Sequence, residues 1–196
     1  MKILCLGDSL THGSVGASYL EFLKGDFDLI NRGLNRDTVI GAYHRLKRYL
    51  EDEELKDFDL CILFIGTNDI FLPYVNFEER AEENTFKSRY KRILTLLKEN
   101  NRSAILVGLA LFEMEEVRSD ALMANKIIRG LAEEFGYPYV DLQGAQLKYL
   151  KENPQTHFTI DGVHFTDISA IILKDELEKL LKNSNYTRSR SENNDY

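Results

Sequence analysis

Two short segments near the ends of the chain contain the residue types that acyl transfer requires. The first is GDSL at residues 7–10, where Ser9 follows an apolar run. The second is DGVH at residues 161–164, where Asp161 lies three residues before His164. A serine hydroxyl is a poor nucleophile at neutral pH, and an imidazole with an ordinary pKa of ~6.5 is suited to activate it. A carboxylate three residues from the histidine is close enough to orient the ring.

Two further polar clusters lie between these segments, at residues 31–33 (NRG) and 66–69 (GTND). The amide of Asn68 can donate hydrogen bonds to a carbonyl oxygen that becomes negative, which an aspartate there could not do. Each cluster alone is weak evidence, because short motifs occur by chance. The GDSL segment also fits a polar turn in which Asp8 or Ser9 caps the next helix.

The elements that must position these clusters are indicated by hydrophobic patterning. Five short β-rich runs alternate with segments of helical spacing, which is typical of an α/β fold. We expect three layers, with a five-stranded, mainly parallel sheet covered by helices on both faces, as in flavodoxin-like folds. The predicted strands are 2–6, 28–31, 60–65, 104–109 and 139–142. In such a sheet, ligands bind beyond the carboxyl ends of the strands, where most of the clusters lie.

Apolar residues at intervals of three and four predict the main helices. These are 39–50, 86–97, 121–135 and 168–181. Gly136 and Pro138 provide a stop signal after the third of them. The segment from Ile70 to Thr85 lacks clear periodicity, so we expect it to be the longest loop.

Composition limits the classes of function. The chain has 196 residues, a net charge of −7 and 43% hydrophobic residues, which predicts one domain over 1–183 and no nucleic-acid partner. Residues 184–196 are polar, and we expect a disordered tail. The sequence predicts neither a signal peptide nor a membrane-spanning segment, and a cytoplasmic protein is expected. Cys5 and Cys61 lie in apolar runs, without the spacing of a metal site or disulfide framework.

The order and content of the four clusters resemble those of the SGNH hydrolases, the GDSL esterase/lipase family. Its members carry Gly-Asp-Ser after the first strand, a block with a donor glycine after the second, Gly-x-Asn-Asp after the third, and Asp-x-x-His before the last helix. The corresponding segments here are GDSL, NRGLNRDT, GTND and DGVH. The resemblance covers residues 2 to about 182.

The resemblance implies a role for each matching residue. Ser9 would be the nucleophile, His164 the general base and Asp161 its orienting carboxylate. The oxyanion hole would be formed by the backbone N–H groups of Ser9 and Gly33 and by the side-chain amide of Asn68. It further implies a serine esterase or acylhydrolase that needs neither cofactor nor metal.

One position departs from the family pattern. The family commonly has a second glycine three residues after the donor glycine, and this chain has Arg36 there. The resemblance therefore does not specify the shape of the loop beside Gly33. Asp8 and Asp69 are expected to brace their turns by accepting backbone N–H bonds rather than to take part in the reaction.

The substrate is not specified by the sequence. Acyl esters, lysophospholipids and acetylated sugars all fall within the range of the family. Aromatic side chains in loops after the third and fourth strands, together with a histidine near DGVH, are candidates to line the substrate site, and they are Phe71, Tyr74, Phe112 and His157. The alternative function is a flavodoxin-like module without catalytic activity, in which residues 9–14 hold a phosphate or a flavin phosphate.

Overall fold

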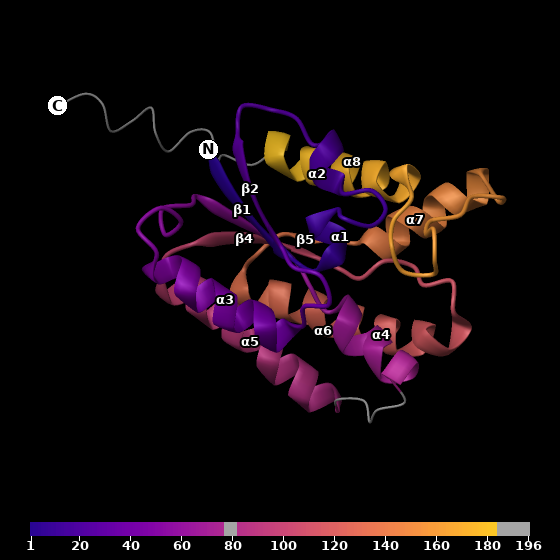
Figure 1. Ribbon diagram of the computed structural model, residues 1–196, viewed down its shortest axis with the longest axis horizontal. Helices are drawn as coiled ribbons and strands as arrows, with labels where there is room; N and C mark the ends of the chain where they lie inside the picture. The colour runs from indigo at the N-terminus through magenta and orange to yellow at the C-terminus, as the bar shows by residue number, and fades with distance from the viewer. Residues whose placement is uncertain (77–81, 184–196) are drawn as a thin grey trace.

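Five parallel strands form the central sheet of the computed structural model, which describes residues 1–76 and 82–183 (Figure 1). The strand order is β2-β1-β3-β4-β5. The strands are β1 (Lys2–Gly7), β2 (Asp28–Gly33), β3 (Leu60–Phe64), β4 (Ser103–Val107) and β5 (Tyr139–Val140). All pairings are parallel, which confirms the expected α/β class.

Helices cover both faces of the sheet, as expected (Figure 1). One face packs against α3 (Val39–Glu51), α4 (Thr67–Asn76), α5 (Glu83–Glu99) and α6 (Glu115–Phe135). The other face packs against α1 (Ser9–His12), α2 (Tyr19–Phe22), α7 (Leu142–Glu152) and α8 (Asp167–Asn183). Each face has its own hydrophobic core.

Strand β1 shows why both cores form. Successive side chains of a strand point to opposite faces of a sheet. Leu4 and Leu6 therefore join the core beneath α3 and α5, whereas Ile3 and Cys5 join the core beneath α8. All four are fully buried, because β1 lies between β2 and β3 and is covered on both sides.

The expected loop over residues 70–85 is wrong in its first part and in its last three residues, which belong to α5. Helix α4 begins inside the GTND cluster and continues to Asn76, with Ile70 buried and Phe71 and Tyr74 packed against the core. Pro73 lies inside this helix and removes a backbone donor, which weakens the helical signal in the sequence. Residues 77–81 lie outside the described residues.

Three predicted strands end earlier than expected, and the one predicted over 60–65 ends at Phe64. The strand predicted over 104–109 ends at Val107, and the one predicted over 139–142 ends at Val140. Beyond β4, the side-chain amide of Asn125 on α6 replaces a strand partner, since it accepts from the Leu109 N–H at 2.6 Å and donates to the Leu109 carbonyl at 3.1 Å. The predicted tail at 184–196 lies outside the described residues. Within the described ranges, no helix has the length and apolar character needed to cross a membrane.

Candidate active site

The order of the strands around β1 produces a crevice that can hold a site. From β1 the chain moves outward to β2, and α3 then returns it past β1 to β3. A crevice forms beyond the carboxyl ends of parallel strands where the order reverses in this way. Gly7, Gly33 and Phe64 end their strands at paired positions of the sheet, so the clusters that follow them meet at one edge.

Ser9 lies at the start of α1, directly beyond β1. Asp8 is the N-cap of this helix, and its Oδ1 accepts from the Leu10 N–H at 3.0 Å, which confirms the capping role. A Cβ at Gly7 would lie 2.1 Å from Thr11 Oγ1 and 2.5 Å from the Phe64 carbonyl oxygen. Glycine is thus required where the chain turns from β1 into α1.

Ser9, His164 and Asp161 form a continuous hydrogen-bonded chain. Ser9 Oγ lies 3.1 Å from His164 Nε2, and His164 Nδ1 lies 2.6 Å from Asp161 Oδ2. Asp161 Oδ1 also accepts from the backbone N–H groups of Val163 at 3.1 Å and His164 at 2.8 Å. Burial raises the pKa of Asp161, but these hydrogen bonds outweigh it and keep the pKa below its ordinary value. The carboxylate therefore stays ionised beside the ring.

The segment that carries His164 is attached to the loop that follows Ser9. An isolated antiparallel bridge joins Thr159 to Phe165, and the Phe165 carbonyl accepts from the Ala17 N–H at 2.9 Å. A Cβ at Gly16, whose φ is +67°, would lie 2.5 Å from that carbonyl oxygen. Residues more than 140 positions apart are thereby held at the distance that a nucleophile and its base require.

Asn68 and Gly33 lie at the ends of the neighbouring strands. Asn68 is buried in the first turn of α4, and its Nδ2 donates to the Asp37 carbonyl at 2.8 Å. The Gly33 N–H donates to Asn31 Oδ1 at 2.9 Å, so it already has an acceptor. Arg36 has a φ of 62°, in the left-handed region that favours glycine. The loop thus keeps the backbone conformation of a glycine at the position where the family commonly has one.

Two carboxyl groups lie beside the site, the buried Asp8 and the half-buried Asp69. Burial raises the pKa of Asp8 to about 7 and that of Asp69 to about 6. Asp69 Oδ2 accepts from the Val39 N–H at 2.9 Å, at the start of α3. Both carboxyl groups accept a backbone hydrogen bond at a helix start, the bracing expected of them.

A residue that the sequence analysis missed lies behind the site. Arg45 of α3 is 7% exposed and pairs with the carboxylate of Asp37. The signal in the sequence is an arginine beside the apolar stripe of a helix, eight residues after an aspartate. From the sequence alone, a buried arginine beside an apolar stripe looks the same as a solvated one. The two can be distinguished only when the orientation of the helix relative to the sheet is known.

Of the four candidates for lining the substrate site, Phe71 and Tyr74 lie on α4, whereas Phe112 and His157 lie in loops. Phe71 and Phe112 stack with ring centroids 6.4 Å apart, and Phe112 is buried. The Tyr74 hydroxyl donates to the Glu116 carbonyl at 2.7 Å and so faces α6. His157 lines an open cavity of about 690 Å³ beside the start of α8.

The remaining histidines differ from His164 in their position. His12 and His44 are exposed, and the His44 ring packs edge-on against Tyr43. His164 is hydrogen-bonded to Ser9 Oγ. No other histidine among the described residues contacts this hydroxyl. In the same part of the chain, no group of three or more His, Cys, Asp or Glu side chains is arranged to hold a metal ion.

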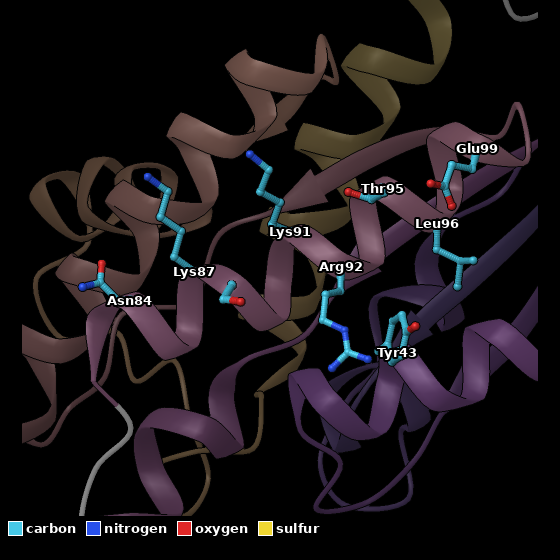
Figure 2. A pocket seen from close by; sticks show the side chains of 9 residues that line it. Tyr43, Asn84, Lys87, Lys91, Arg92, Thr95, Leu96 and Glu99 are labelled. Atoms are coloured by element: carbon cyan, nitrogen blue, oxygen red, sulfur yellow. The ribbon is translucent and has the colours of Figure 1, made fainter.

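Two cavities lie along α3, one near the site and one away from it. A cavity of about 450 Å³ is lined by His12, Arg32, Gly33 and Tyr49, next to the carboxyl end of β2. The other, of about 490 Å³, lies between α3 and α5 (Figure 2). Its lining residues are Tyr43, Asn84, Lys87, Ser88, Lys91, Arg92, Thr95, Leu96 and Glu99, none of which belongs to the four clusters.

Several solved structures share this fold. The acetyl xylan esterase AlAXEase is 24% identical, covers 92% of this chain and 100% of its own, and has a TM-score of 0.80. A variant of the acetyl xylan esterase Axe2 from Geobacillus stearothermophilus is 21% identical over 91% of this chain and 93% of its own, with a TM-score of 0.76. The lipase/acylhydrolase from Enterococcus faecalis is 20% identical over 92% and 95%, with a TM-score of 0.75.

A comparison with curated proteins found no match. The sequence profile of the GDSL-like Lipase/Acylhydrolase family matches residues 5–168, a span that contains all four clusters. This confirms the resemblance drawn from GDSL, GTND and DGVH. The chain belongs to the GDSL-like lipase/acylhydrolase family and is an ester-cleaving hydrolase.

Proposed function

We propose that the protein is a serine esterase that cleaves a carboxylic ester through an acyl-enzyme on Ser9. The observation that carries this proposal is the hydrogen-bonded chain from Ser9 Oγ through His164 to Asp161, with distances of 3.1 Å and 2.6 Å. A nucleophile within reach of a base, which is itself oriented by a third group, is the arrangement that acyl transfer needs.

In the first half of the reaction, Ser9 Oγ attacks the ester carbonyl carbon while its proton passes to His164 Nε2. The carbonyl oxygen becomes an oxyanion, and Asp161 stabilises the imidazolium from the other side of the ring. The C–O bond to the alcohol then breaks, and the alcohol leaves with the proton from His164. In the second half, His164 takes a proton from water while the water oxygen attacks the acyl carbon. The bond between the acyl carbon and Ser9 Oγ then breaks, Ser9 Oγ regains its proton from His164, and the carboxylic acid leaves.

The oxyanion is stabilised by donors on three neighbouring elements. The Ser9 N–H lies in the first turn of α1, where N–H groups have no acceptor within the helix. Asn68 uses one amide hydrogen for the Asp37 carbonyl, which leaves its second hydrogen for substrate. Gly33 contributes when its N–H is shared between Asn31 Oδ1 and the oxyanion.

Acetyl esters of sugars are the first substrates to test. Two structural neighbours are described as acetyl xylan esterases, and this supports a small acyl group on a carbohydrate alcohol. Acyl esters and lysophospholipids are the alternatives within the family. Phe71, Tyr74, Phe112 and His157 remain the proposed contacts for substrate.

A fluorophosphonate probe on the full chain tests the nucleophile. We expect the probe to label Ser9 and the protein to hydrolyse p-nitrophenyl acetate. Ser9→Ala should abolish both while the melting temperature changes little. The matched control is Ser14→Ala, in the loop that follows α1, whose hydroxyl accepts from the Asn35 side-chain amide at 2.9 Å. The proposal is wrong if another serine is labelled, or if the Ser9→Ala protein hydrolyses the ester normally.

The same preparation tests the alternative function. A flavodoxin-like binding module would carry a flavin or a bound phosphate and would give no labelling of Ser9. An absorbance spectrum recorded before labelling detects a flavin, and the labelling of Ser9 distinguishes a serine esterase from a module that binds only phosphate.

A further inference from the structure

Arg45 connects the ends of β1 and β2 with the loop that leads into α3. Its Nη2 donates to the Gly7 carbonyl at 2.9 Å and also to Asp37 Oδ2. Its Nη1 donates to the Arg32 carbonyl at 2.5 Å, and its Nε donates to Asp37 Oδ2 at 2.9 Å. One buried side chain thus contacts the residue that ends β1, the residue before Gly33, and the loop that leads into α3.

All five N–H donors of the guanidinium are used. The fifth bond is from Nη1 to the Tyr49 hydroxyl at 3.4 Å. A guanidinium presents these donors in a rigid plane, so the directions of its acceptors are fixed relative to one another. A lysine has three donors on a single nitrogen and cannot reach both carbonyl oxygens and the carboxylate in this arrangement.

Three of the four acceptors of Arg45, all except the Tyr49 hydroxyl, lead to a residue of the proposed mechanism. The Gly7 carbonyl also accepts from the Leu34 N–H at 3.1 Å, so the peptide before Asp8 is held from two sides, immediately upstream of Ser9. The Arg32 carbonyl belongs to the peptide bond whose nitrogen is the Gly33 N–H.

The third acceptor leads to Asn68. The carboxylate of Asp37 pairs with Arg45, and the backbone carbonyl of Asp37 accepts from Asn68 Nδ2 at 2.8 Å. The orientation of the Asn68 amide therefore depends on where Asp37 is held. Each proposed oxyanion donor is therefore close to an acceptor of Arg45. Ser9 is two residues after Gly7, Gly33 is one residue after Arg32, and Asn68 is hydrogen-bonded to Asp37.

Gly41 shows that this arrangement is tightly packed. A Cβ at Gly41, in the first turn of α3, would lie 1.9 Å from Asp37 Oδ1. Any other residue at this position would displace the carboxylate from Arg45. The sequence thus provides both the charged pair and the space in which it fits.

We infer that Arg45 is a positioning residue for the oxyanion hole, acting through Gly7, Arg32 and Asp37 on the donors of Ser9, Gly33 and Asn68. This inference rests on the proposed function. Arg45 is behind the strand ends and does not touch the reacting atoms. Its loss should therefore change transition-state stabilisation more than substrate binding, because oxyanion donors act mainly when the charge develops.

The experiment compares Arg45→Lys and Arg45→Met with a matched control. The control is Arg102→Met. Arg102 also donates from Nη1 to a backbone carbonyl, that of Phe58 at 3.0 Å, but it lies just before β4, at the amino ends of the strands and away from the site. We expect both Arg45 variants to lose about 10- to 100-fold in kcat on p-nitrophenyl acetate, with KM within about threefold of wild type. Arg102→Met should lower the melting temperature and keep its kcat.

A double variant separates positioning from general destabilisation. If Arg45 acts through Asn68, the loss of kcat in Arg45→Lys/Asn68→Ala should be clearly smaller than the product of the two single losses. Fully multiplicative losses would overturn the inference, as would Arg45 variants that keep kcat within about threefold of wild type. Arg45→Lys retains a buried positive charge for Asp37 and so provides a folded variant if Arg45→Met does not fold. A wild-type protein that neither hydrolyses esters nor reacts with the probe would instead refute the proposed function.

Discussion

Asn68 has two amide hydrogens, and contacts among the described residues use one of them. That bond, to the Asp37 carbonyl at 2.8 Å, fixes the plane of the amide. The second hydrogen then points in a direction set by the first, in the manner of a preorganised donor. The same contact gives Asn68 a structural role, so its two functions must be distinguished by experiment.

Asn68→Ala is expected to lower kcat by about 10²–10³ and to change KM far less, as for the loss of one oxyanion donor elsewhere. The lost hydrogen bond should cost about 1 kcal/mol of stability. Asn68→Asp should be at least as damaging, because a carboxylate would repel the oxyanion. The measurements are kcat, KM and melting curves for both variants. A folded Asn68→Ala enzyme that keeps more than about a third of wild-type kcat would remove Asn68 from the mechanism.

The contact between α1 and the end of β2 depends on a glycine. A Cβ at Gly33 would lie 2.2 Å from the backbone nitrogen of His12 and 2.6 Å from its Cα. Gly33→Ala should therefore displace α1, which begins with Ser9, and destabilise the fold by about 1–3 kcal/mol. We expect kcat to fall at least tenfold, because small displacements of a nucleophile are costly.

Gly130→Ala is the matched control for this prediction. Gly130 lies inside α6, and a Cβ there would meet nothing within 4 Å. Alanine at this position should stabilise the protein by about 0.5–1 kcal/mol and leave kcat unchanged. Denaturant unfolding and kinetics of both variants provide the comparison. A Gly33→Ala protein as stable as wild type would show that α1 accommodates the methyl group.

The elements differ in how well the sequence predicts them. Helix α5 is evident from apolar residues such as Ile93 and Leu97, because its long stripe faces a core. Helices α1 and α2 have four residues each, too few to show a period. The segments that carry Ser9 and His164 are identifiable because their chemistry is local. The network of Arg45 is not, since it depends on contacts between residues 38 positions apart.

The stability of the whole molecule should depend on pH through Asp8 and Asp69. Burial holds their pKa values at about 7 and about 6, compared with an ordinary value of 3.8. Between about pH 4 and 7 the folded state therefore binds more protons than the unfolded state, and the contribution of these groups to stability is lost as pH rises.

Asp8→Asn should remove the larger part of this dependence. Its side-chain oxygen can still accept from the Leu10 N–H, and it carries no charge to bury. We expect the variant to exceed wild type in unfolding free energy by about 2–4 kcal/mol at pH 8, with the difference shrinking toward pH 5. Denaturant unfolding across this range measures it, with Asp26→Asn on an exposed loop as the control. A difference that does not vary with pH would contradict the prediction.

The parallel sheet places every proposed reacting group at one edge and leaves the turns before the strands at the other. The chain has two cysteines, and both are buried thiols whose pKa burial raises, to about 12 for Cys5. Neither is suited to react with a maleimide at neutral pH. A thiol introduced at exposed Lys24, in the turn before β2, would provide a single attachment point. An enzyme immobilised through it would present its active edge to the solution.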